Sequence, residues 1–419
     1  MHFTIILAGL GIMASVASAR PHKTLSSRQS PGAQNVVYWG QNGGGIVENN
    51  DLSAYCTSTS GVDIIVLAFL YSYGNGNNIP SGTIGQSCFI STSGEGQDCT
   101  NIQTSIPICQ AAGIKVILSL GGATGSYSLQ SDAEAETIGQ YLWDSYANSG
   151  NTAVERPFGD SFVNGFDFDI ELNDGFSQFY PSMISTLRSN FASDPDNTYY
   201  ITGAPQCPIP EPNMGVIIGN STFDYLWVQF YNNNNGWPSL PNMTFESCSL
   251  GFNGNAPFNY NQWVDYLATT PSADAKLFIG MPAAPLGANG LASGETYYIT
   301  PVQLAQLVEE YHTNSAFGGL MMWSAGFSDS NVIDGCTYAQ QGQEILLTGA
   351  PCDGTVPTSP LSTHSLSATA TPTSTGTSAT GTVGAYDQCG GTGYTGSTAC
   401  ISGYVCTEIS SAYSQCDPS

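Results

Sequence analysis

The sequence predicts an α/β protein, a (β/α)8 TIM barrel followed by a small disulfide-stapled β module at the C-terminus. The barrel is predicted because short apolar, β-branched runs recur eight times between residues 31 and 352, often with helical patterns between them. The module is predicted because four cysteines crowd into residues 389–416 after a Ser/Thr/Pro-rich stretch. A doubly wound open sheet is the alternative, weakened because no glycine-rich phosphate loop follows the first run.

Most of the eight runs are apolar on both faces, as expected of parallel strands that are buried on both sides. The runs are residues 35–39, 62–70, 114–120, 163–170, 199–203, 225–231, 276–281 and 318–323. Helix signals lie between them: a capping-box pair, apolar residues at helical spacing, and a proline at a first helical position. These signals are Ser131 with Glu134; Met183, Leu187 and Phe191; and Thr300-Pro301.

The two ends of the chain differ in composition from the barrel region. Residues 5–16 are largely apolar and are followed by small residues at 17–19, the pattern of a secretory signal peptide. That stretch is too short to span a bilayer, so we expect a secreted, extracellular protein without a membrane partner. Ser, Thr, Pro, Gly and Ala dominate residues 353–385, which predicts an extended, O-glycosylated linker. The expected domains are a signal peptide (1–19), a short N-terminal segment (20–30), the barrel (31–352), the linker (353–385) and the module (386–419).

Charge and histidine content exclude several classes of function. The net charge is −25, and beyond residue 30 only four side chains are cationic, so nucleic acid is not an expected partner. His312 is the only histidine of the barrel, which leaves no His-rich zinc site and a single candidate for any His-dependent catalytic triad. We expect no cofactor, no metal and a monomer. The twelve cysteines of a secreted chain predict disulfides rather than reactive thiols.

Three acidic side chains alternate along the fourth run, where residues 163–172 read VNGFDFDIEL. Asp167, Asp169 and Glu171 share one face of a strand, about 6.6 Å apart in succession. Like charges this close in a low dielectric cannot all ionise, so at least one carboxyl keeps a proton, and glycoside hydrolysis uses such a group as its general acid. The alternative is a solvated acidic face of an amphipathic strand. The neighbouring runs are apolar throughout, which instead points the acids into the barrel, with Glu171 at its C-terminal mouth.

These motifs resemble glycoside hydrolase family 18, in particular the plant and fungal class III chitinases. The family signature D-G-x-D-x-D-x-E occurs at residues 164–171 with Asn164 in place of the first acid, and the second signature, S-x-G-G, occurs at residues 119–122. Residues 38–42 (YWGQN), 228–233 (VQFYNN) and 321–323 (MMW) are also similar to this class. The resemblance covers residues 31–352. It implies an endochitinase that hydrolyses β-1,4-linked N-acetylglucosamine polymers.

The resemblance also implies a role for each catalytic residue. Glu171 protonates the leaving glycosidic oxygen, and the substrate's own acetamido oxygen is the nucleophile, so the anomeric configuration is retained. Asp169 orients that acetamide, and Asp167 shares a proton behind it. Tyr231 donates its hydroxyl to the acetamide.

Further residues are implied to bind the substrate. Gln229 contacts the sugar, and Trp323 forms an apolar floor beneath it. The other residues expected along the cleft are Tyr38, Gln41, Phe69, Gly122, Ala123 and Met281. Asn164 removes a charge beneath the three acids, so we expect it to tune their pKa values.

The C-terminal segment resembles the fungal family 1 carbohydrate-binding module in its cysteine spacing and aromatic residues. Such a module stacks a flat row of aromatic rings on the sugars of a crystalline polysaccharide. Tyr386 and Tyr413 match two platform positions and Gln415 a polar contact, but Ala412 stands where a third ring is usual. Tyr404 is the candidate to replace that ring. The alternative is a disulfide knot without a binding function.

Disulfide pairs follow from the two resemblances. They are Cys56–Cys109, Cys88–Cys99, Cys207–Cys248 and, as the remaining pair, Cys336–Cys352 in the barrel, with Cys389–Cys406 and Cys400–Cys416 in the module. Asn220 and Asn242 each begin an N-x-S/T sequence and are candidates for N-glycosylation.

Two other functions compete with an endochitinase. An endo-β-N-acetylglucosaminidase acting on N-glycans shares the fold and the acid motif, and a lectin shares the barrel without activity. The intact Glu171 disfavours the lectin. The polysaccharide-binding tail favours chitin and its oligosaccharides as partners over soluble glycoproteins.

Removing the C-terminal module tests whether the barrel hydrolyses the substrate and the module binds the polysaccharide surface. We expect truncation after about residue 352 to preserve hydrolysis of soluble chitooligosaccharides but to slow attack on crystalline chitin, because tethering raises the enzyme's concentration at a surface. Tyr413→Ala should reproduce much of the loss, and binding to cellulose should fall in parallel. Depletion assays on chitin and cellulose measure this; equal binding by full-length, truncated and Tyr413→Ala protein would show that the tail is only a stable knot.

Overall fold

The computed structural model describes residues 30–41, 50–172, 176–233, 246–253 and 256–354, together with parts of the C-terminal region (382–383, 388–390, 398–400, 402, 404–410 and 413–418). The chain divides into two compact units, Met1–Ser362 and Thr363–Ser419. The expected signal peptide, the linker except for residues 353–354 and 382–383, Tyr386 and Asn242 lie outside the described residues.

The first unit is a closed barrel of eight parallel strands, which confirms the predicted fold class. Each strand pairs in parallel with its two neighbours, and β1 closes the ring by pairing with both β2 and β12. The strands are β1 (Gln34–Trp39), β2 (Ile64–Gly74), β6 (Lys115–Gly122), β8 (Gly165–Ile170), β9 (Tyr200–Gly203), β10 (Tyr225–Gln229), β11 (Lys276–Pro282) and β12 (Phe317–Trp323). Each predicted run overlaps one of them.

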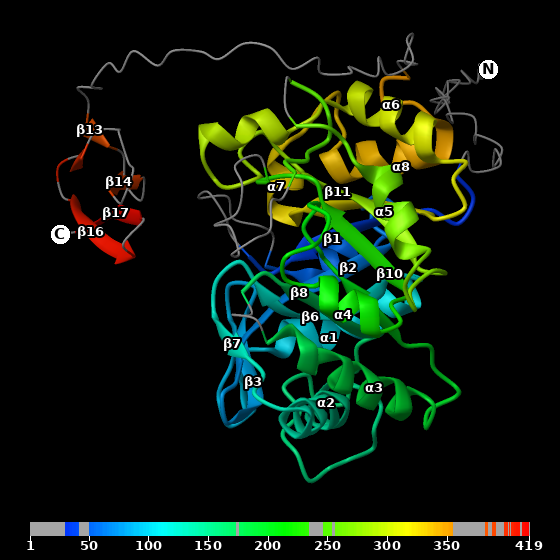
Figure 1. Cartoon of the computed structure of the whole chain (residues 1–419), viewed down its shortest axis with the longest axis vertical. Helices are drawn as coiled ribbons and strands as arrows, with labels where there is room; N and C mark the ends of the chain where they lie inside the picture. Colours follow the sequence, from blue (N-terminus) through cyan, green and yellow to red (C-terminus); the bar gives the residue numbers. More distant parts are fainter. Residues whose placement is uncertain are drawn as a thin grey trace, which may run out of the picture. The chain divides into compact units, whose positions relative to one another are not determined.

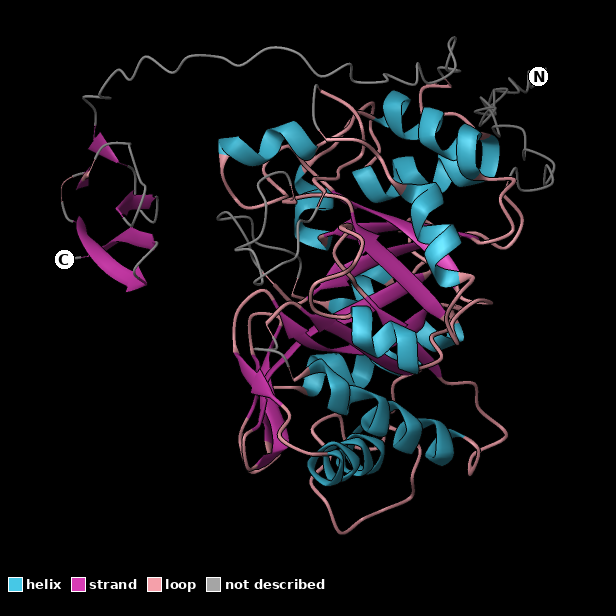
Figure 2. Ribbon diagram, viewed as in Figure 1, coloured by secondary structure: helices cyan, strands magenta, loops and turns pink. Residues whose placement is uncertain are grey.

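Helices surround the strands, as the ribbon in Figure 2 shows. They are α1 (Thr100–Ala111), α2 (Asp132–Tyr146), α3 (Tyr180–Phe191), α4 (Gly215–Asn220), α5 (Tyr260–Leu267), α6 (Pro301–Tyr311), α7 (Ala325–Ser330) and α8 (Tyr338–Thr348), with the 3-10 turns η1 (Leu52–Tyr55), η2 (Ser177–Phe179) and η3 (Ala292–Tyr297). Thr300 begins α6 with a complete capping box. Ser131 caps α2 by accepting from the Glu134 N–H, but the Glu134 carboxylate accepts from Gln130 N instead of the cap residue.

Four short strands extend the barrel beside β2 at its C-terminal end. They are β3 (Asn77–Ile84), β4 (Cys88–Ile90), β5 (Gly96–Gln97) and β7 (Ser126–Ser128). The strands β3 and β7 both pair with β2 and lie together at the lower left of Figure 1. This insertion brings side chains of β7 close to the mouth of the barrel.

The apolar core has two layers, because strand side chains alternate between the barrel interior and the surrounding helices. The inner layer holds buried residues such as Val36, Trp227 and Phe278, and the larger outer layer packs the strands against the helices. Fully burying one such large side chain stabilises the fold by about 1.5–3 kcal/mol. The two layers together fix which strand residues can reach a site inside the barrel.

Three residues that immediately precede strands close the amino-terminal end of the barrel. The side chain of Asp63 accepts from Asn35 N at 2.8 Å, Asn164 from Val116 N at 2.9 Å, and Asp224 from Ile201 N at 2.7 Å. Each therefore caps a backbone N–H at the start of the preceding barrel strand.

This arrangement corrects the expectation for Asn164. Its Oδ1 also accepts from Gln110 of α1 at 3.1 Å, so the side chain points away from the barrel interior rather than lying beneath the acids. Asn164 is an uncharged member of a structural ring.

The stability of the barrel should therefore depend on Asn164 more than its catalysis does. Asn164→Ala leaves the buried Val116 N–H unpaired, so we expect the free energy of unfolding to fall by about 1–3 kcal/mol. Asn164→Asp keeps an acceptor and should cost less. All six tryptophans precede residue 353, so tryptophan fluorescence in urea reports on the barrel alone. A shifted pH–activity profile in Asn164→Asp would contradict the structural role.

Four disulfides link parts of the barrel unit, and their pairs are the ones that the resemblance implies. They are Cys56–Cys109, Cys88–Cys99, Cys207–Cys248 and Cys336–Cys352. The second unit contains β13 (Thr382–Val383), β14 (Gln388–Gly390), β15 (Ala399–Cys400), β16 (Tyr404–Ser410) and β17 (Tyr413–Pro418). In this unit β17 pairs antiparallel with both β14 and β16, and Cys389 is bonded to Cys406.

Candidate active site

The three predicted acids lie in sequence order along β8 and face the inside of the barrel. Asp167 is fully buried, Asp169 is 4% exposed, and Glu171 follows the last residue of β8 and is half-buried. Their alternation follows from the strand geometry, since Phe166 and Phe168 point into the outer core. The row therefore climbs from the closed interior toward the open end of the barrel.

Asp167, the deepest acid, is held by three hydroxyl groups from three different strands. Ser119 and Tyr38 donate to its Oδ2 at 2.6 and 2.7 Å, and Thr202 donates to its Oδ1 at 2.8 Å. Burial raises the pKa of Asp167 to about 6, and these hydrogen bonds oppose the rise. Trp227 donates to the Tyr38 oxygen at 2.8 Å, which leaves the Tyr38 proton for Asp167.

Asp169 and Glu171 form a coupled pair. Burial raises the pKa of Asp169 well above its usual range, and the charges of Glu171 and Asp167 raise it further. Burial also raises the pKa of Glu171, while hydrogen bonds from Gln229, Asp169 and Gln206 oppose that rise. The raised pKa values of both carboxyls favour their protonated forms more than is usual for exposed carboxyls.

Gln229 on β10 faces this pair. Its Nε2 lies 3.0 Å from Asp169 Oδ1 and 3.4 Å from Glu171 Oε1, and it also donates to Ala204 O at 3.0 Å. We expected Gln229 to contact the sugar, but its amide nitrogen is directed at the acids. Gln229 therefore fixes the carboxyl orientations.

The glycine pair of the S-x-G-G motif gives the acids their space. Gly121 and Gly122 adopt positive φ values of 106° and 95°. A Cβ at Gly121 would lie 2.1 Å from the Asp169 carbonyl oxygen, and one at Gly122 would lie 3.1 Å from the Phe69 ring. Side chains at these positions would push β6 away from β8 and from the Phe69 ring.

Tyr127 on the inserted strand β7 holds the backbone at the catalytic end of β8. Its hydroxyl donates to Gly122 O at 2.7 Å and accepts from Glu171 N at 3.0 Å and Leu172 N at 2.9 Å. The pKa of Tyr127 is raised by burial, so its hydroxyl stays protonated. This side chain anchors Glu171 although the family motifs do not include it.

Aromatic rings line one side of the site. Trp323 stacks on Phe69 with ring centroids 6.0 Å apart and lies 5.6 Å from the Tyr38 ring. Tyr231 packs with Tyr297 and the same Trp323. Tyr231 is close enough to Asp169 and Glu171 that their charges add to the effect of burial in raising its pKa. The predicted floor, the acids and Tyr231 are thus brought together, and the exposed Ala123 lies beyond the glycine pair.

One of the expected cleft residues, Met281, does not line the site. Met281 is fully buried in the outer core, where its sulfur accepts from Tyr338 of α8 at 3.7 Å. Its parity on β11 matches Leu277 and Ile279, while Phe278 points inward. Gln41 donates its amide to Ala68 O at 3.1 Å and to Thr83 O at 3.4 Å, so it joins β1 to β2 and β3.

Several residues that contact the acids or their hydrogen-bond partners were not predicted from the sequence. Thr202 and Trp227 share their strand face with residues that point inward, so strict alternation could have found them. Ser119 is the first residue of the S-x-G-G signature, but no role was assigned to it. Gln206 and Tyr127 lie on a loop and an inserted strand, where sequence periodicity gives no signal.

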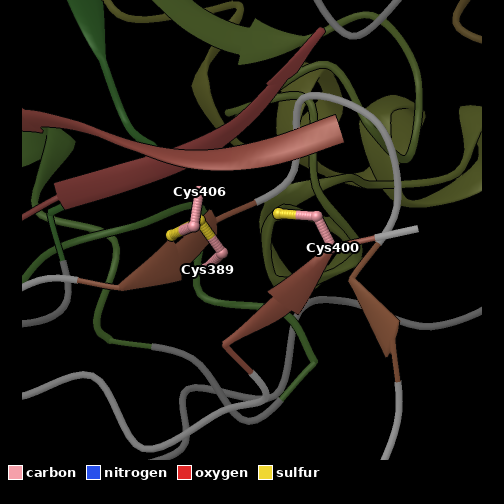
Figure 3. Close-up of side chains that lie close together, drawn as sticks. All are labelled: Cys389, Cys400 and Cys406. Carbon is pink, nitrogen blue, oxygen red and sulfur yellow. A yellow bond between two sulfur atoms is a disulfide. The ribbon is translucent and has the colours of Figure 1, made fainter. Parts of the chain in front are cut away.

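Three cysteine sulfurs of the C-terminal unit lie within 4.8 Å of one another, a spacing that a metal ion would fit. Figure 3 shows Cys389 bonded to Cys406, with the sulfur of Cys400 apart from them. Cys400 is itself disulfide-bonded, and the side chain of its expected partner, Cys416, lies outside the described residues. Metal binding requires thiolates, so this cluster is not a metal site. The side chains of Tyr404, Tyr413 and Gln415 also lie outside the described residues.

The arrangement fits acid-catalysed bond cleavage at the mouth of a barrel. It places two carboxyls with raised pKa values beside a tyrosine hydroxyl and an aromatic surface, and buried hydroxyls hold Asp167 beneath them. Among the described helices, none is long and apolar enough to cross a membrane.

Comparisons with known proteins agree with this chemistry. The model of the glycosyl hydrolases of family 18 matches residues 34–296, and that of the fungal cellulose binding domain matches residues 385–416. The chain is 60% identical to Endochitinase 2 of Metarhizium anisopliae, over 99% of this chain and 100% of that protein.

Two solved structures share the barrel. The ICChI chitinase of Ipomoea carnea is 31% identical with a TM-score of 0.57, covering 74% of this chain and 99% of that chain. The xylanase and alpha-amylase inhibitor protein XAIP-II of Scadoxus multiflorus is 28% identical with a TM-score of 0.57, covering 75% and 98%. Since these two names describe different functions, the fold alone does not identify the activity of the barrel.

Proposed function

Because this chain belongs to the glycosyl hydrolases of family 18, we propose that it is a secreted endochitinase that cleaves β-1,4 linkages in N-acetylglucosamine polymers with retention of configuration. The observation that carries the proposal is the row of acids that ends at the barrel mouth, where Asp169 and Glu171 both face the amide of Gln229. The 60% identity to a full-length protein named Endochitinase 2 supports the substrate.

The first half of the reaction uses a proton carried by Glu171. Glu171, at the mouth, gives its proton to the glycosidic oxygen as the bond from that oxygen to the anomeric carbon breaks. The acetamido oxygen of the same sugar attacks the anomeric carbon and forms an oxazolinium ion. Asp169 then faces a developing positive charge, and its carboxylate form is favoured at that moment.

A carboxylate nucleophile is not supported by the geometry. Asp169 lies on the same strand face as Glu171, whereas a nucleophile must approach the sugar from the side opposite the acid. Asp167 is fully buried beneath Asp169. The acetamido group of the substrate itself supplies the missing nucleophile, and water later opens the ring with Glu171 acting as base.

Tyr231 and the aromatic wall suit the same substrate. We propose that Tyr231 donates to the acetamido group and that Trp323 lies beneath the distorted sugar ring. The C-terminal unit, matched by the fungal cellulose binding domain, would bring the barrel to an insoluble polysaccharide surface. Asn220 is exposed at the end of α4, as an N-glycosylation site requires.

Product analysis tests the proposed activity. Incubation with chitin hexamer should release shorter oligomers whose new reducing ends are initially β-anomers, seen by proton NMR. A high-mannose glycopeptide should be left intact. Cleavage of the glycopeptide instead would identify an endo-β-N-acetylglucosaminidase, and initial α-anomer release would exclude substrate assistance.

The general acid can be tested by one substitution. Glu171→Gln keeps the size and shape of the side chain but removes its proton donor, so we expect hydrolysis of the hexamer to fall about 100- to 10,000-fold. Oligosaccharide binding and the circular dichroism spectrum should be unchanged. Retention of more than about a tenth of the wild-type rate would overturn the assignment.

A further inference from the structure

Gln206, which follows β9 at the mouth, contacts one carboxyl oxygen of the proposed general acid, while Gln229 faces the other. Its Nε2 donates to Glu171 Oε2 at 3.3 Å, while Gln229 Nε2 lies 3.4 Å from Glu171 Oε1. The two glutamines form a parallel β-bridge with each other, and Gln229 N donates to Pro205 O at 2.8 Å. Each oxygen of the Glu171 carboxyl thus faces the side-chain amide of one of these two paired glutamines.

The loop after β9 holds the Gln206 amide in one orientation. Asn213 Nδ2 donates to Gln206 Oε1 at 3.2 Å, so the amide oxygen is turned toward Asn213 and the NH2 group toward Glu171. The opposite orientation would place two oxygens against each other at Glu171.

A buried carboxylate fixes this loop in turn. Glu211 is 5% exposed and accepts from Gln206 N at 3.2 Å and from Asn213 N and Gly215 N at 2.8 Å each, and it also accepts from Met214 N. The same side chain therefore ties the backbone of Gln206 to the backbone of the residue that orients its amide. This accounts for a buried acid that the proposed reaction does not use.

We propose that Gln206 is a positioning residue for the general acid, oriented by Asn213 and the Glu211-held loop, and that it stabilises the charge that appears on Glu171 as the proton leaves. The inference rests on the proposed function. A neutral carboxyl gains little from two facing NH2 groups, whereas a carboxylate gains a hydrogen bond on each oxygen. The contact is therefore stronger in the transition state than in the ground state, and its loss should lower kcat rather than raise KM.

The pH profile provides a readout that a merely structural residue would not change. Removing a donor to the carboxylate raises the pKa of Glu171. Since the acid acts in its protonated form and the rate falls as pH rises through its pKa, the alkaline limb of the profile moves to higher pH. Other titratable groups around Glu171 stay in place in the variants below; they are Asp169 and Asp167 on β8, Tyr127 on β7, Tyr231 after β10, and Glu211 after β9.

The experiment compares Gln206→Met with Gln341→Met in the full chain. Methionine matches glutamine in length and lacks the amide. Gln341 is equally suited as a control because it is fully buried, donates to Ile333 O at 2.7 Å and accepts from Cys352 N at 2.8 Å, away from the acids. On chitin hexamer we expect Gln206→Met to lower kcat about tenfold with little change in KM, and to move the alkaline limb upward by about half a unit or more. Gln341→Met should lower only the thermal midpoint.

Asn213→Ala is the second variant, because it leaves Gln206 in place and removes the partner that orients its amide. This variant should shift the alkaline limb of the pH–rate profile in the same direction by a smaller amount. Carbon-13 NMR of glutamate-labelled protein, with the Glu171 resonance assigned from Glu171→Gln, measures the same pKa shift without any substrate. If wild-type protein does not cleave the hexamer, the proposed function is refuted. The carbon-13 titration still decides whether Gln206 sets the pKa of Glu171, because it needs no substrate.

Two results would overturn the positioning role. One is an unshifted Glu171 titration in both Gln206→Met and Asn213→Ala. The other is a raised KM at unchanged kcat in Gln206→Met, which would make Gln206 a sugar contact.

Discussion

The burial of three carboxyl groups inside the barrel is the constraint on which the site depends. Asp167 is fully buried and Asp169 nearly so, and an uncompensated charge in such a place costs several kcal/mol. The fold meets this cost with uncharged donors from several strands: the Tyr38, Ser119 and Thr202 hydroxyls for Asp167 and the Gln229 amide for Asp169. Closing the sheet into a ring is what brings donors from β1, β6, β9 and β10 to a single strand.

The sequence predicted the features that depend on local pattern. The eight apolar runs located the strands, and the alternation of residues 167, 169 and 171 located the acid row before any contact was known. Met281 was expected along the cleft from the family resemblance alone. Strand alternation would have excluded it, because residues 277, 279 and 281 of β11 share the outward face. Where periodicity was applied, the prediction agreed with the structure.

Residues whose position depends on tertiary contacts could not be predicted in this way. Tyr127 reaches Glu171 only because β7 pairs with β2, and Gln206 does so only because a bridge aligns it with Gln229. The role of Asn164 likewise became clear only beside Asp63 and Asp224, which cap N–H groups at the same end of the barrel. The departure from the family signature therefore lies among residues that support the fold.

Charge is segregated along the barrel, in agreement with the raised pKa values of Asp169 and Glu171. Lys115 and Lys276 are the first residues of β6 and β11, and Arg188 pairs with Asp224 at 2.9 Å just before β10 begins. A strand of seven residues spans about 20 Å, so these cations lie at the opposite end of the barrel from the carboxyl ends of the strands. A cation beside Asp169 or Glu171 would favour the carboxylates and lower their pKa values. The donors that the structure describes around Asp169 and Glu171 are neutral, so burial dominates and raises the pKa values of both carboxyls.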